Sequence, residues 1–413
     1  MNISFKILIA LFCLNIPSYP ALAQSQDCHC QDNLDFLYTK IRKIPAYKKN
    51  KQAADLEYHR LSLIASQKDT EYDCFILLNR FLLSIRDNHS RVYGSNKGLT
   101  QEVREDSLRF AAYPHSADFI LYPAPVMDLD SLKHVLEKKP FNDIEGVYSK
   151  TGVITIGVLK SGEDYLAIVL EAENSVWQPG ELLYTLVPYG NDYLLCIGGN
   201  LSTRRMVAFT ERIHQGTFLN AGFQKDTSRI NYAILPVYPD TTFFRKELAS
   251  DITYLKVGSF KSFHPTLGEA ERFYASLEGT LDKTNLIVDL RNNGGGGVRN
   301  SGILFNILKE YLKSNNVYVL INHRTASNAE QFTFRLSQFE NCRIIGNRSQ
   351  GTLAYELEGM NVTFPCAPFT AVLASKTHSK YLALESNGIA PEMILDDNTD
   401  WIQQTVRIIL RTQ

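Results

Sequence analysis

The pattern of hydrophobic and polar positions changes twice along the chain, and the changes divide it into three parts. Between about residues 28 and 93, apolar residues recur every three or four positions, as in "NLDFLYTKIRKI" and "EYDCFILLNRFLLSIRD", and glycine and proline are almost absent. This period predicts amphipathic helices. We therefore expect residues 24–105 to form a small helical N-terminal domain.

The middle of the chain has the pattern of short β-strands. Four apolar runs follow one another there, namely "GVITIGVLK", "DYLAIVLEA", "ELLYTLVPY" and "DYLLCIG", separated by the turn-forming residues "SGE", "QPG" and "GND". Apolar runs of this length between tight turns predict an antiparallel sheet. We expect residues 106–245 to form an antiparallel β-barrel or sandwich.

Strands and helices alternate from about residue 251 onward. The strand-like runs are "ITYLKVGSF", "NLIVDL", "VYVLIN" and "CRIIG", and helical patterns such as "TLGEAERFYASLEG" and "NSGILFNILKEYLK" lie between them. This order is typical of an α/β layer with a largely parallel sheet. Residues 246–413 are therefore expected to form an α/β domain, and the whole chain to have a multidomain α+β fold.

The N-terminus has the pattern of a secretory signal. Lys6 is followed by the mostly apolar run Ile7–Ile16 and then by "ALA" directly before Gln24. Such a charged, apolar and small-residue order predicts a signal peptide over residues 1–23, and an exported protein that is periplasmic or secreted. Acylation at Cys13 is the alternative, but a bulky residue precedes this cysteine and the apolar run would be truncated.

Composition adds little about partners. The net charge is -1 and 21% of residues are charged, so there is neither a basic surplus for nucleic acid nor an acidic tail. After the signal peptide no run approaches the ~18 apolar residues of a membrane span. Six cysteines remain there, an even number that permits disulfides in an exported chain, most favourably from the "CHC" segment to Cys74. They are Cys28, Cys30, Cys74, Cys196, Cys342 and Cys366.

One short stretch, "HRTASNAEQF", lies where a strand ends and a helix begins. Ser327 and Glu330 within it fit a capping box, in which the two side chains close the open N–H groups of the first helical turn. The alternative is that Ser327 is a nucleophile at the N-terminus of the helix. The spacing of the two residues is compatible with both interpretations.

A second unusual stretch is "NLIVDLRNNGGGGVRN", in which four consecutive glycines follow a buried strand. Glycines leave a row of backbone N–H groups unshielded. A phosphate-binding loop would continue with Gly-Lys-Ser/Thr, which is absent here. A flexible strand-to-helix turn is a second interpretation. An oxyanion hole fits better, because a tetrahedral acyl intermediate requires free N–H groups at such a position.

These two stretches together resemble a known family. "IVDLRNNGGG", followed after about 30 residues by "TASNAEQF", is similar to the catalytic core of the tail-specific (C-terminal processing) and tricorn-core serine peptidases, which have a ClpP/crotonase-like fold. The resemblance runs from roughly Ile252 to the C-terminus. It implies that Ser327 is the nucleophile, and that the oxyanion hole is formed by N–H groups of Asn328 and of Gly294 or Gly295.

The resemblance also suggests which base activates the serine. The tail-specific branch uses a downstream lysine, and "GNRSQGTLAY" has Thr352 in that position, which cannot act as a base. The tricorn-like branch uses a histidine and a glutamate. "RDNHSRV" supplies His89, and "ESNGIAPEM" supplies Glu385, although Glu392 replaces the family's aspartate. The rival bases are His323, Lys376 and Lys380.

The resemblance therefore implies an exported serine endopeptidase that hydrolyses flexible or unfolded polypeptides through Ser327, His89 and Glu385, without a metal or other cofactor. A non-catalytic relative that binds peptides or another ligand is the alternative.

Many relatives carry a PDZ domain, but its carboxylate-binding loop is not found in the middle region, which is loosely similar to a lipocalin-type sheet. A histidine base of ordinary pKa predicts activity that falls on acidification around pH 6 to 7.

Overall fold

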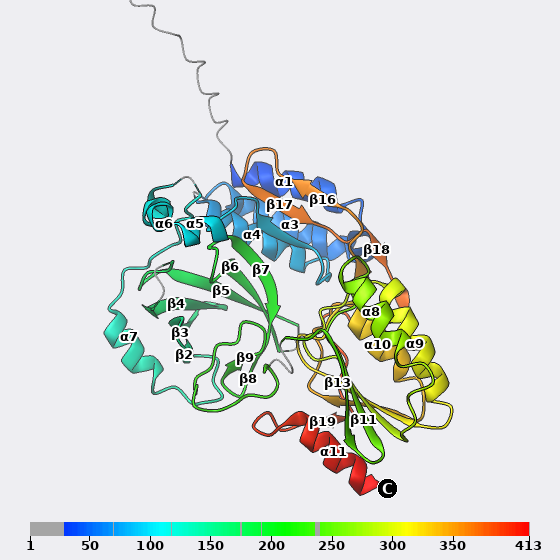
Figure 1. The fold of residues 1–413 in the computed structure, drawn as a ribbon. Helices are drawn as coiled ribbons and strands as arrows, with labels where there is room; N and C mark the ends of the chain where they lie inside the picture. Colours follow the sequence, from blue (N-terminus) through cyan, green and yellow to red (C-terminus); the bar gives the residue numbers. More distant parts are fainter. Residues whose placement is uncertain are drawn as a thin grey trace, which may run out of the picture.

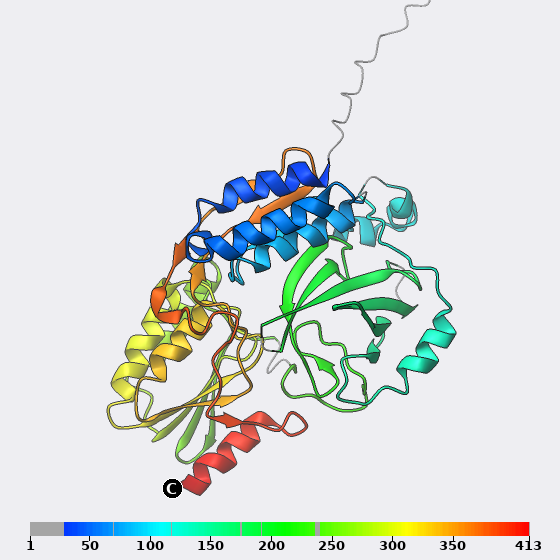
Figure 2. The same ribbon diagram turned by 180° about the vertical axis from the view of Figure 1, so that it is seen from behind.

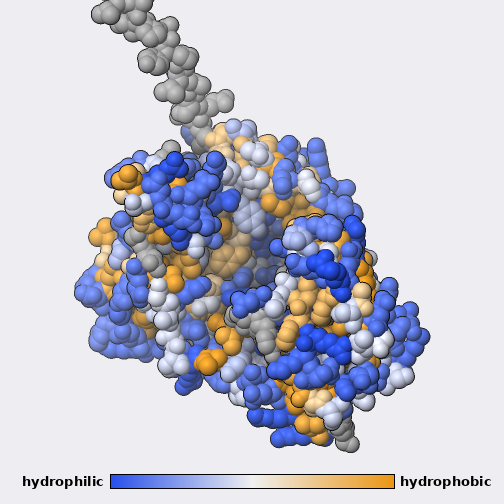
Figure 3. Space-filling model, viewed as in Figure 1, coloured by the Kyte–Doolittle hydropathy of each residue, from blue (hydrophilic) through white to orange (hydrophobic). Residues whose placement is uncertain are grey.

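The computed structural model describes residues 29–68, 70–116, 118–173, 176–190, 192–235 and 240–412. The expected signal peptide, residues 1–23, lies outside these residues. Figures 1 and 2 show N-terminal helices along one side, an antiparallel sheet below them, and a layered α/β part beside that sheet. Figure 3 shows a hollow in the middle of this face, where the three parts meet.

The N-terminal part is helical, as its apolar period predicts. Its helices are α1 (Cys30–Ile41), α2 (Pro45–Lys49), α3 (Lys51–Ala65) and α4 (Glu71–Leu83). Helix α4 begins where Thr70 Oγ1 accepts a hydrogen bond from the Asp73 N–H at 3.0 Å, and it buries Phe75 completely. A disulfide joins Cys30 to Cys74. This bond is of the kind that the sequence favoured, because it links the "CHC" segment to Cys74.

Short helices precede the antiparallel sheet. They are α5 (Gln101–Glu105), α6 (Ser107–Ala112), the 3-10 turn η1 (Tyr113–His115) and α7 (Leu129–Leu136). Asp106 and Asp128 cap α6 and α7, since each carboxylate accepts two N–H groups of the turn that follows it. Within the range 106–245 the first strand among the described residues therefore begins at Gly146, because capping aspartates favour helices in the first part of that range.

The antiparallel sheet is an up-and-down meander in which each strand pairs with the next along the chain. Its strands are β2 (Gly146–Lys150), β3 (Ile154–Ser161), β4 (Asp164–Ala172), β5 (Leu182–Tyr189), β6 (Tyr193–Gly199) and β7 (Met206–Glu211). Every residue of β6 is buried, and Tyr72 of α4 donates a hydrogen bond to the Ile197 carbonyl at 3.2 Å. Helix α4 therefore rests on this sheet. A small hairpin follows, formed by β8 (Ile213–His214) and β9 (Thr217–Phe218).

The α/β part contains the second large sheet, of order β10-β11-β12-β13-β14-β19, in which only the β10–β11 pair is antiparallel. The strands are β10 (Phe243–Ala249), β11 (Ile252–Val257), β12 (Asn285–Asp289), β13 (Asn316–Ile321), β14 (Cys342–Gly346) and β19 (Met393–Ile394). The helices are α8 (Thr266–Ala275), α9 (Val298–Tyr311), α10 (Asn328–Leu336) and α11 (Trp401–Thr412). The alternation predicted from the sequence is confirmed.

Helices cover both faces of this sheet, which is why its strands are continuously apolar. Leu255 and Val288 point into the core shared with α8, α9 and α10, whereas Tyr254 and Ile287 point to the opposite face, where Trp401 of α11 packs. Figure 1 shows α11 apart from the other three helices. Among the described residues, no helix is both long and apolar enough to cross a membrane.

Strand pairing connects the N-terminal part of the chain with its C-terminal part. Strand β1 (Arg91–Gly94) pairs antiparallel with β17 (Phe369–Val372), which also pairs with β16 (Asn361–Thr363). A two-stranded pair, β15 (Tyr355–Glu356) with β18 (Lys376–Thr377), comes from the segments directly before β16 and after β17, and the 3-10 turn η2 (Ser379–Tyr381) follows. Figure 1 shows β16 and β17 beside the N-terminal helices. The expected unit of residues 246–413 thus extends into the expected unit of residues 24–105.

The packing of α11 yields a stability prediction. Trp401 is fully buried, so Trp401→Ala should lower the free energy of unfolding by about 3–5 kcal/mol, as for other large-to-small core substitutions. Leu410 lies on the same helix and is 53% exposed. Leu410→Ala is the matched control and should cost under about 0.5 kcal/mol. Urea unfolding measures both, and equal losses would contradict this packing.

Candidate active site

Ser327 lies at the carboxyl end of β13, directly before helix α10. The loop between them is fixed by hydrogen bonds, because the Asn322 N–H donates to Thr325 Oγ1 at 3.0 Å and the Ala326 N–H donates to the Asn293 carbonyl at 3.0 Å. Ser327 itself has φ 53°, in the left-handed region that residues other than glycine rarely adopt. Backbone strain of this kind persists only where the surroundings impose it, and it is frequent at functional sites.

A buried carboxylate supports this strained residue. Ser327 and Glu330 have the arrangement of a capping box, and the Ser327 N–H donates to Glu330 Oε2 at 3.0 Å. The same carboxylate accepts hydrogen bonds from Ser349 Oγ at 2.6 Å, from the Gly351 N–H at 2.7 Å and from the Thr352 N–H at 2.9 Å. Burial raises the pKa of Glu330 to about 7, and these hydrogen bonds act in the opposite direction. Glu330 therefore ties the start of α10 to the loop at residues 349–352.

His89 reaches Ser327 from the N-terminal part of the chain. It follows α4 in a tight turn, in which the His89 N–H donates to Asp87 Oδ1 at 2.8 Å and the Ser90 hydroxyl donates to Asp87 Oδ2. His89 Nε2 lies 3.2 Å from Ser327 Oγ. Burial, with a smaller effect of Arg91, lowers the pKa of His89 to about 4. The imidazole is therefore neutral at pH 7 and can accept a proton.

Glu385 lies beside this turn and is buried. Its carboxylate accepts three backbone hydrogen bonds, from Asn88 at 2.9 Å, from Leu353 at 2.9 Å and from Ala354 at 2.7 Å. Burial raises the pKa of Glu385 to about 8, and the neighbouring Asp87 carboxylate adds to this. Glu385 therefore holds the histidine turn against the segment at residues 353–354.

No hydrogen bond joins Glu385 to His89 among the described residues. The Nδ1 atom of His89 is buried and has no partner there. Asp87, His89 and Glu385 nevertheless each bring one nitrogen or oxygen atom within 4.8 Å of the others. One imidazole and two carboxylates are ligand types that could hold a metal ion, but the carboxylates already accept the hydrogen bonds described above. The arrangement therefore favours a histidine flanked by two acids.

Asp87 is a site residue that the sequence did not reveal. It is 2% exposed, and burial raises its pKa. Its position two residues before the histidine is the spacing at which an aspartate side chain accepts a backbone N–H of its own turn. That spacing was a usable signal for Asp87, whereas Glu385 was expected beside the histidine only because of the family resemblance.

The glycine-rich loop passes beside the Ser327 backbone. Gly295 has φ 92°, and a Cβ atom on it would lie 2.8 Å from the Asn328 nitrogen and 2.9 Å from Ser327 Cβ, so only glycine fits. The Gly295 N–H donates to Asn293 Oδ1 at 2.9 Å. Within the described residues, the N–H groups of Gly294 and Asn328 have no such partner. Of the two glycines, Gly294 therefore has the N–H that is free for a ligand.

The rival bases have other environments. His323 is 2% exposed, and burial lowers its pKa to about 3. Lys376 is exposed and forms an ion pair with Glu358, and Lys380 is also exposed. In the part of the chain that the structure describes, none of the three is hydrogen-bonded to Ser327.

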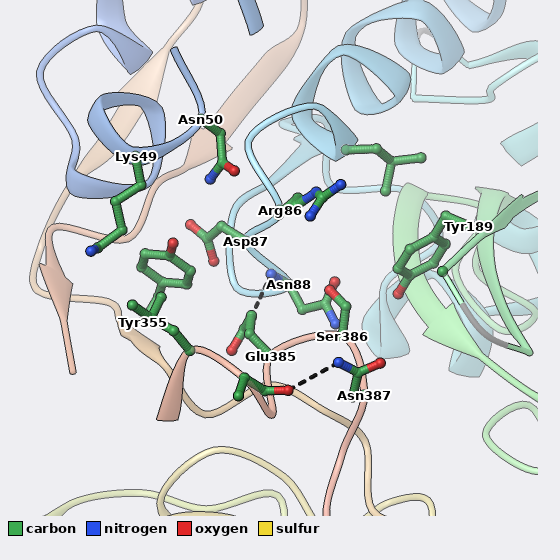
Figure 4. Close-up of a pocket in the computed structure, with 14 residues that line it drawn as sticks. Lys49, Asn50, Arg86, Asp87, Asn88, Tyr189, Tyr355, Glu385, Ser386 and Asn387 are labelled. Carbon is green, nitrogen blue, oxygen red and sulfur yellow. Dashed lines mark hydrogen bonds between the residues drawn. The ribbon is translucent and has the colours of Figure 1, made fainter. Parts of the chain in front are cut away.

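A cavity of about 570 Å³ lies on the other side of the histidine turn. Figure 4 shows Asp87, Asn88 and Glu385 between its walls, with Lys49 on one side and Tyr189 on the other. Its walls come from the N-terminal helices, from β5 and from the C-terminal segment. The cavity thus borders the acidic side of the site, and Ser327 does not line it.

No family model matches the chain, and no curated protein sequence matches it. Solved structures match it over more than nine-tenths of its length, at low sequence identity. A peptidase candidate from Parabacteroides merdae is 15% identical, with 93% of this chain and 98% of that chain covered and a TM-score of 0.41. The photosystem II D1 C-terminal processing protease is 13% identical, with 92% and 97% covered and a TM-score of 0.39.

The tricorn protease is 12% identical, with 93% of this chain but 37% of that chain covered and a TM-score of 0.43. The chain is thus similar in structure to C-terminal processing and tricorn proteases.

The burial of His89 leads to a pH prediction. Its pKa of about 4 lies below the ordinary value of 6.5, so the neutral form should persist to lower pH in the folded protein than the sequence predicts. We expect the His89 Cε1–H resonance, assigned with His89→Ala, to titrate near pH 4 in an NMR titration. A midpoint between pH 6 and 7 would contradict the buried environment.

The role of Glu330 leads to a second prediction. Glu330→Gln leaves one acceptor oxygen and places an amide NH₂ among donors, so the start of α10 should lose its support. We expect a serine-directed fluorophosphonate probe to label Ser327 at least ~10-fold more slowly, with a stability loss of about 1–3 kcal/mol. Glu340→Gln, at an exposed glutamate after the same helix, is the control. Labelling of Glu330→Gln at the parent rate would exclude the positioning role.

Proposed function

We propose that the protein is an exported serine endopeptidase that hydrolyses peptide bonds of flexible polypeptides, and that its α/β part is a ClpP/crotonase-like core. One observation carries this proposal: His89 Nε2 lies 3.2 Å from Ser327 Oγ although the two residues are 238 positions apart. The serine has a strained backbone and begins a helix, and the histidine is neutral. Nucleophilic catalysis by serine requires such a base within hydrogen-bond reach of the hydroxyl group.

The proposed mechanism follows from proton transfer. As Ser327 Oγ attacks the substrate carbonyl, its proton passes to His89 Nε2, and the protonated histidine then donates that proton to the leaving amine. An acyl-enzyme remains, and water activated by the same histidine hydrolyses it. Each half of the reaction returns the proton, so no cofactor is needed.

The negative oxygen of the tetrahedral intermediate needs donors near Ser327. The N–H groups of Asn328 and Gly294 fit this role, because both are free and belong to segments that meet at the serine. The N-terminus of α10 adds the partial positive charge of a helix start. This assigns the oxyanion hole to Gly294 rather than Gly295, whose N–H is bonded to Asn293.

Two acids stabilise the histidine cation that forms during attack. Glu385 and Asp87 have oxygen atoms within 4.8 Å of a His89 ring nitrogen, so they act by charge across a short gap. Catalytic hydrogen bonds are often long in unliganded enzymes and shorten when substrate binds. We therefore assign Glu385 as the third member of the triad and Asp87 as a second stabilising carboxylate.

The N-terminal sequence and the molecular surface support the proposed compartment and substrate. The signal-like N-terminus supports export to the periplasm or outside the cell. The hollow on the face shown in Figure 3 is open and has apolar residues in its walls. An extended polypeptide segment fits such a hollow better than a compact folded domain does. Flexible or unfolded polypeptides are therefore the proposed substrates.

A non-catalytic binding module remains the second candidate because of one observation. Both oxygens of Glu385 are occupied by backbone N–H groups, so this carboxylate has a structural role whether or not the protein is an enzyme. A binding module would retain this scaffold and show no reaction at Ser327.

Substitutions at the two central residues separate these candidates. Ser327→Ala should abolish peptide hydrolysis and probe labelling, and His89→Ala should lower turnover by at least ~10³-fold, as for other triads. Stability should change by only about 0.5–2 kcal/mol for Ser327→Ala, the effect of losing a helix cap. Hydrolysis of a fluorogenic peptide mixture and mass-spectrometric mapping of the label measure these outcomes.

Ser337→Ala, at the other end of α10, is the matched control and should retain activity. Activity in pure Ser327→Ala protein would exclude the nucleophile assignment. A folded parent protein that neither labels nor cleaves would favour the binding module.

A further inference from the structure

The cavity of about 570 Å³ beside the histidine turn has no part in the proposed mechanism, because Ser327 does not line it. Asp87 and Glu385 both line it, and so do Lys49 and Arg86. Figure 4 shows these side chains around the cavity. Lys49 and Arg86 are exposed, so the cavity opens to solvent. A small solute can therefore approach the two acids from the side that faces away from Ser327.

The two acids are buried and lack a cationic partner. Asp87 is 2% exposed and Glu385 is 7% exposed. In the part of the chain that the structure describes, their carboxylates accept hydrogen bonds from backbone N–H groups and from the Ser90 hydroxyl, and neither forms an ion pair. Arg91 is close, but its Nη1 atom donates to the backbone carbonyl of Asp87 at 3.1 Å. Buried carboxylates are normally paired or bind a metal ion.

Each carboxylate keeps one oxygen atom that has room for a further partner. Among the described residues, Asp87 Oδ2 accepts one hydrogen bond, from the Ser90 hydroxyl. Glu385 Oε1 likewise accepts one, from the Asn88 N–H at 2.9 Å. An ionised carboxylate has about four lone-pair sites on its two oxygens. The hydrogen bonds that hold the histidine turn therefore leave each acid able to act as a ligand.

His89 supplies a third ligand atom. Its Nε2 atom faces Ser327, and its Nδ1 atom is buried without a partner among the described residues. Buried polar atoms normally have a partner in the protein, a water molecule or an ion. A ring nitrogen of His89 and one oxygen of each acid lie within 4.8 Å of one another, so some point is at most about 2.8 Å from all three atoms.

These three ligand atoms favour a transition-metal ion. Zn²⁺ binds imidazole nitrogen and carboxylate oxygen at about 2.0–2.2 Å, so shifts of about 1 Å would complete the coordination. Mg²⁺ and Ca²⁺ prefer sites made of oxygen atoms alone. Three protein ligands leave the fourth position of a tetrahedral zinc ion open, and a water molecule from the cavity fits that position. The charges of Lys49 and Arg86 are exposed and therefore screened by solvent.

We propose that Asp87, His89 and Glu385 bind a divalent transition-metal ion such as Zn²⁺, and that the bound ion inhibits the reaction at Ser327. Inhibition rests on the proposed peptidase function, whereas metal binding does not. The ion is an inhibitor and not a cofactor.

Inhibition follows from the position of the ring proton. A neutral His89 that accepts the Ser327 proton at Nε2 carries its own proton at Nδ1. A metal ion at Nδ1 takes the lone pair of that nitrogen, so the ring proton moves to Nε2 through solvent. Nε2 then has no lone pair for the serine proton. The same histidine can therefore serve either as the base or as a metal ligand, but not as both.

Binding of zinc chloride and of magnesium chloride to the parent protein tests the metal site. In calorimetric titrations we expect Zn²⁺ to bind at least ~10-fold more tightly than Mg²⁺, because the histidine ligand favours zinc. Long-range ¹H–¹⁵N NMR spectra, assigned with His89→Ala, should show zinc at Nδ1 and the ring proton at Nε2. Coordination through Nε2 would contradict the proposed geometry.

Substitutions assign the binding to the three ligands. His89→Ala, Asp87→Asn and Glu385→Gln should each weaken zinc binding by at least ~10-fold. His378→Ala is the matched control, because His378 lies 2.9 Å from Glu356 in a partly exposed pair with similar ligand types. This variant should bind zinc as the parent does. Thermal unfolding shows which variants are folded, and each folded variant tests its own ligand.

Serine-directed fluorophosphonate labelling tests the inhibition. Saturating Zn²⁺ should slow labelling of Ser327 in the parent protein by at least ~10-fold, and EDTA should restore the rate. An unchanged labelling rate in the zinc-bound parent would overturn the inhibition.

Two results overturn the metal site: no preference of the folded parent for Zn²⁺ over Mg²⁺, or unchanged zinc binding in the folded ligand variants. Loss of binding in His378→Ala alone would identify an adventitious ion only. A parent that is labelled at Ser327 but does not bind zinc excludes the metal site alone. An unlabelled parent whose zinc binding depends on the three ligands excludes the peptidase, and with it the inhibition, and retains the metal site.

Discussion

The candidate site depends on four consecutive backbone N–H groups that are divided between two buried carboxylates. The N–H groups of Gly351 and Thr352 donate to Glu330, and those of Leu353 and Ala354 donate to Glu385. Glu330 also holds the Ser327 backbone, and Glu385 also holds the turn that contains the histidine. Because hydrogen bonds to charged groups contribute about 1.5–3 kcal/mol each, this short segment fixes Ser327 and His89 relative to each other.

The same segment explains how one chain can lack a lysine here and still form a site. Thr352 contributes its backbone N–H to Glu330, a contact that any residue except proline can make. The side chain at this position can therefore vary while the backbone contact is kept. The proposed base, His89, lies instead in the turn before β1, which the pairing of β1 with β17 brings to the α/β part.

Local pattern predicted the elements, and tertiary contacts decided their connections. The order of strands and helices from β11 to β14 follows from alternating apolar runs, and the serine and histidine followed from short motifs. The β1–β17 pairing was not foreseen, because the pairing of distant strands leaves no periodic signal in a single sequence. The acceptor roles of Asp87 and Glu385 were missed for a related reason. Their hydrogen bonds come from backbone N–H groups, which nearly every residue type has, so no sequence motif indicates them.

Burial shifts the pKa values of the two ionisable groups in the site in opposite directions. Burial lowers the pKa of His89 to about 4 and raises that of Glu385 to about 8, so each charged form is disfavoured alone. The three backbone N–H groups that donate to Glu385 favour its anionic form against the effect of burial. In the proposed mechanism, proton transfer from Ser327 to His89 forms a cation beside this anion, and at about 5 Å their attraction is about 3 kcal/mol at an effective dielectric constant of 20.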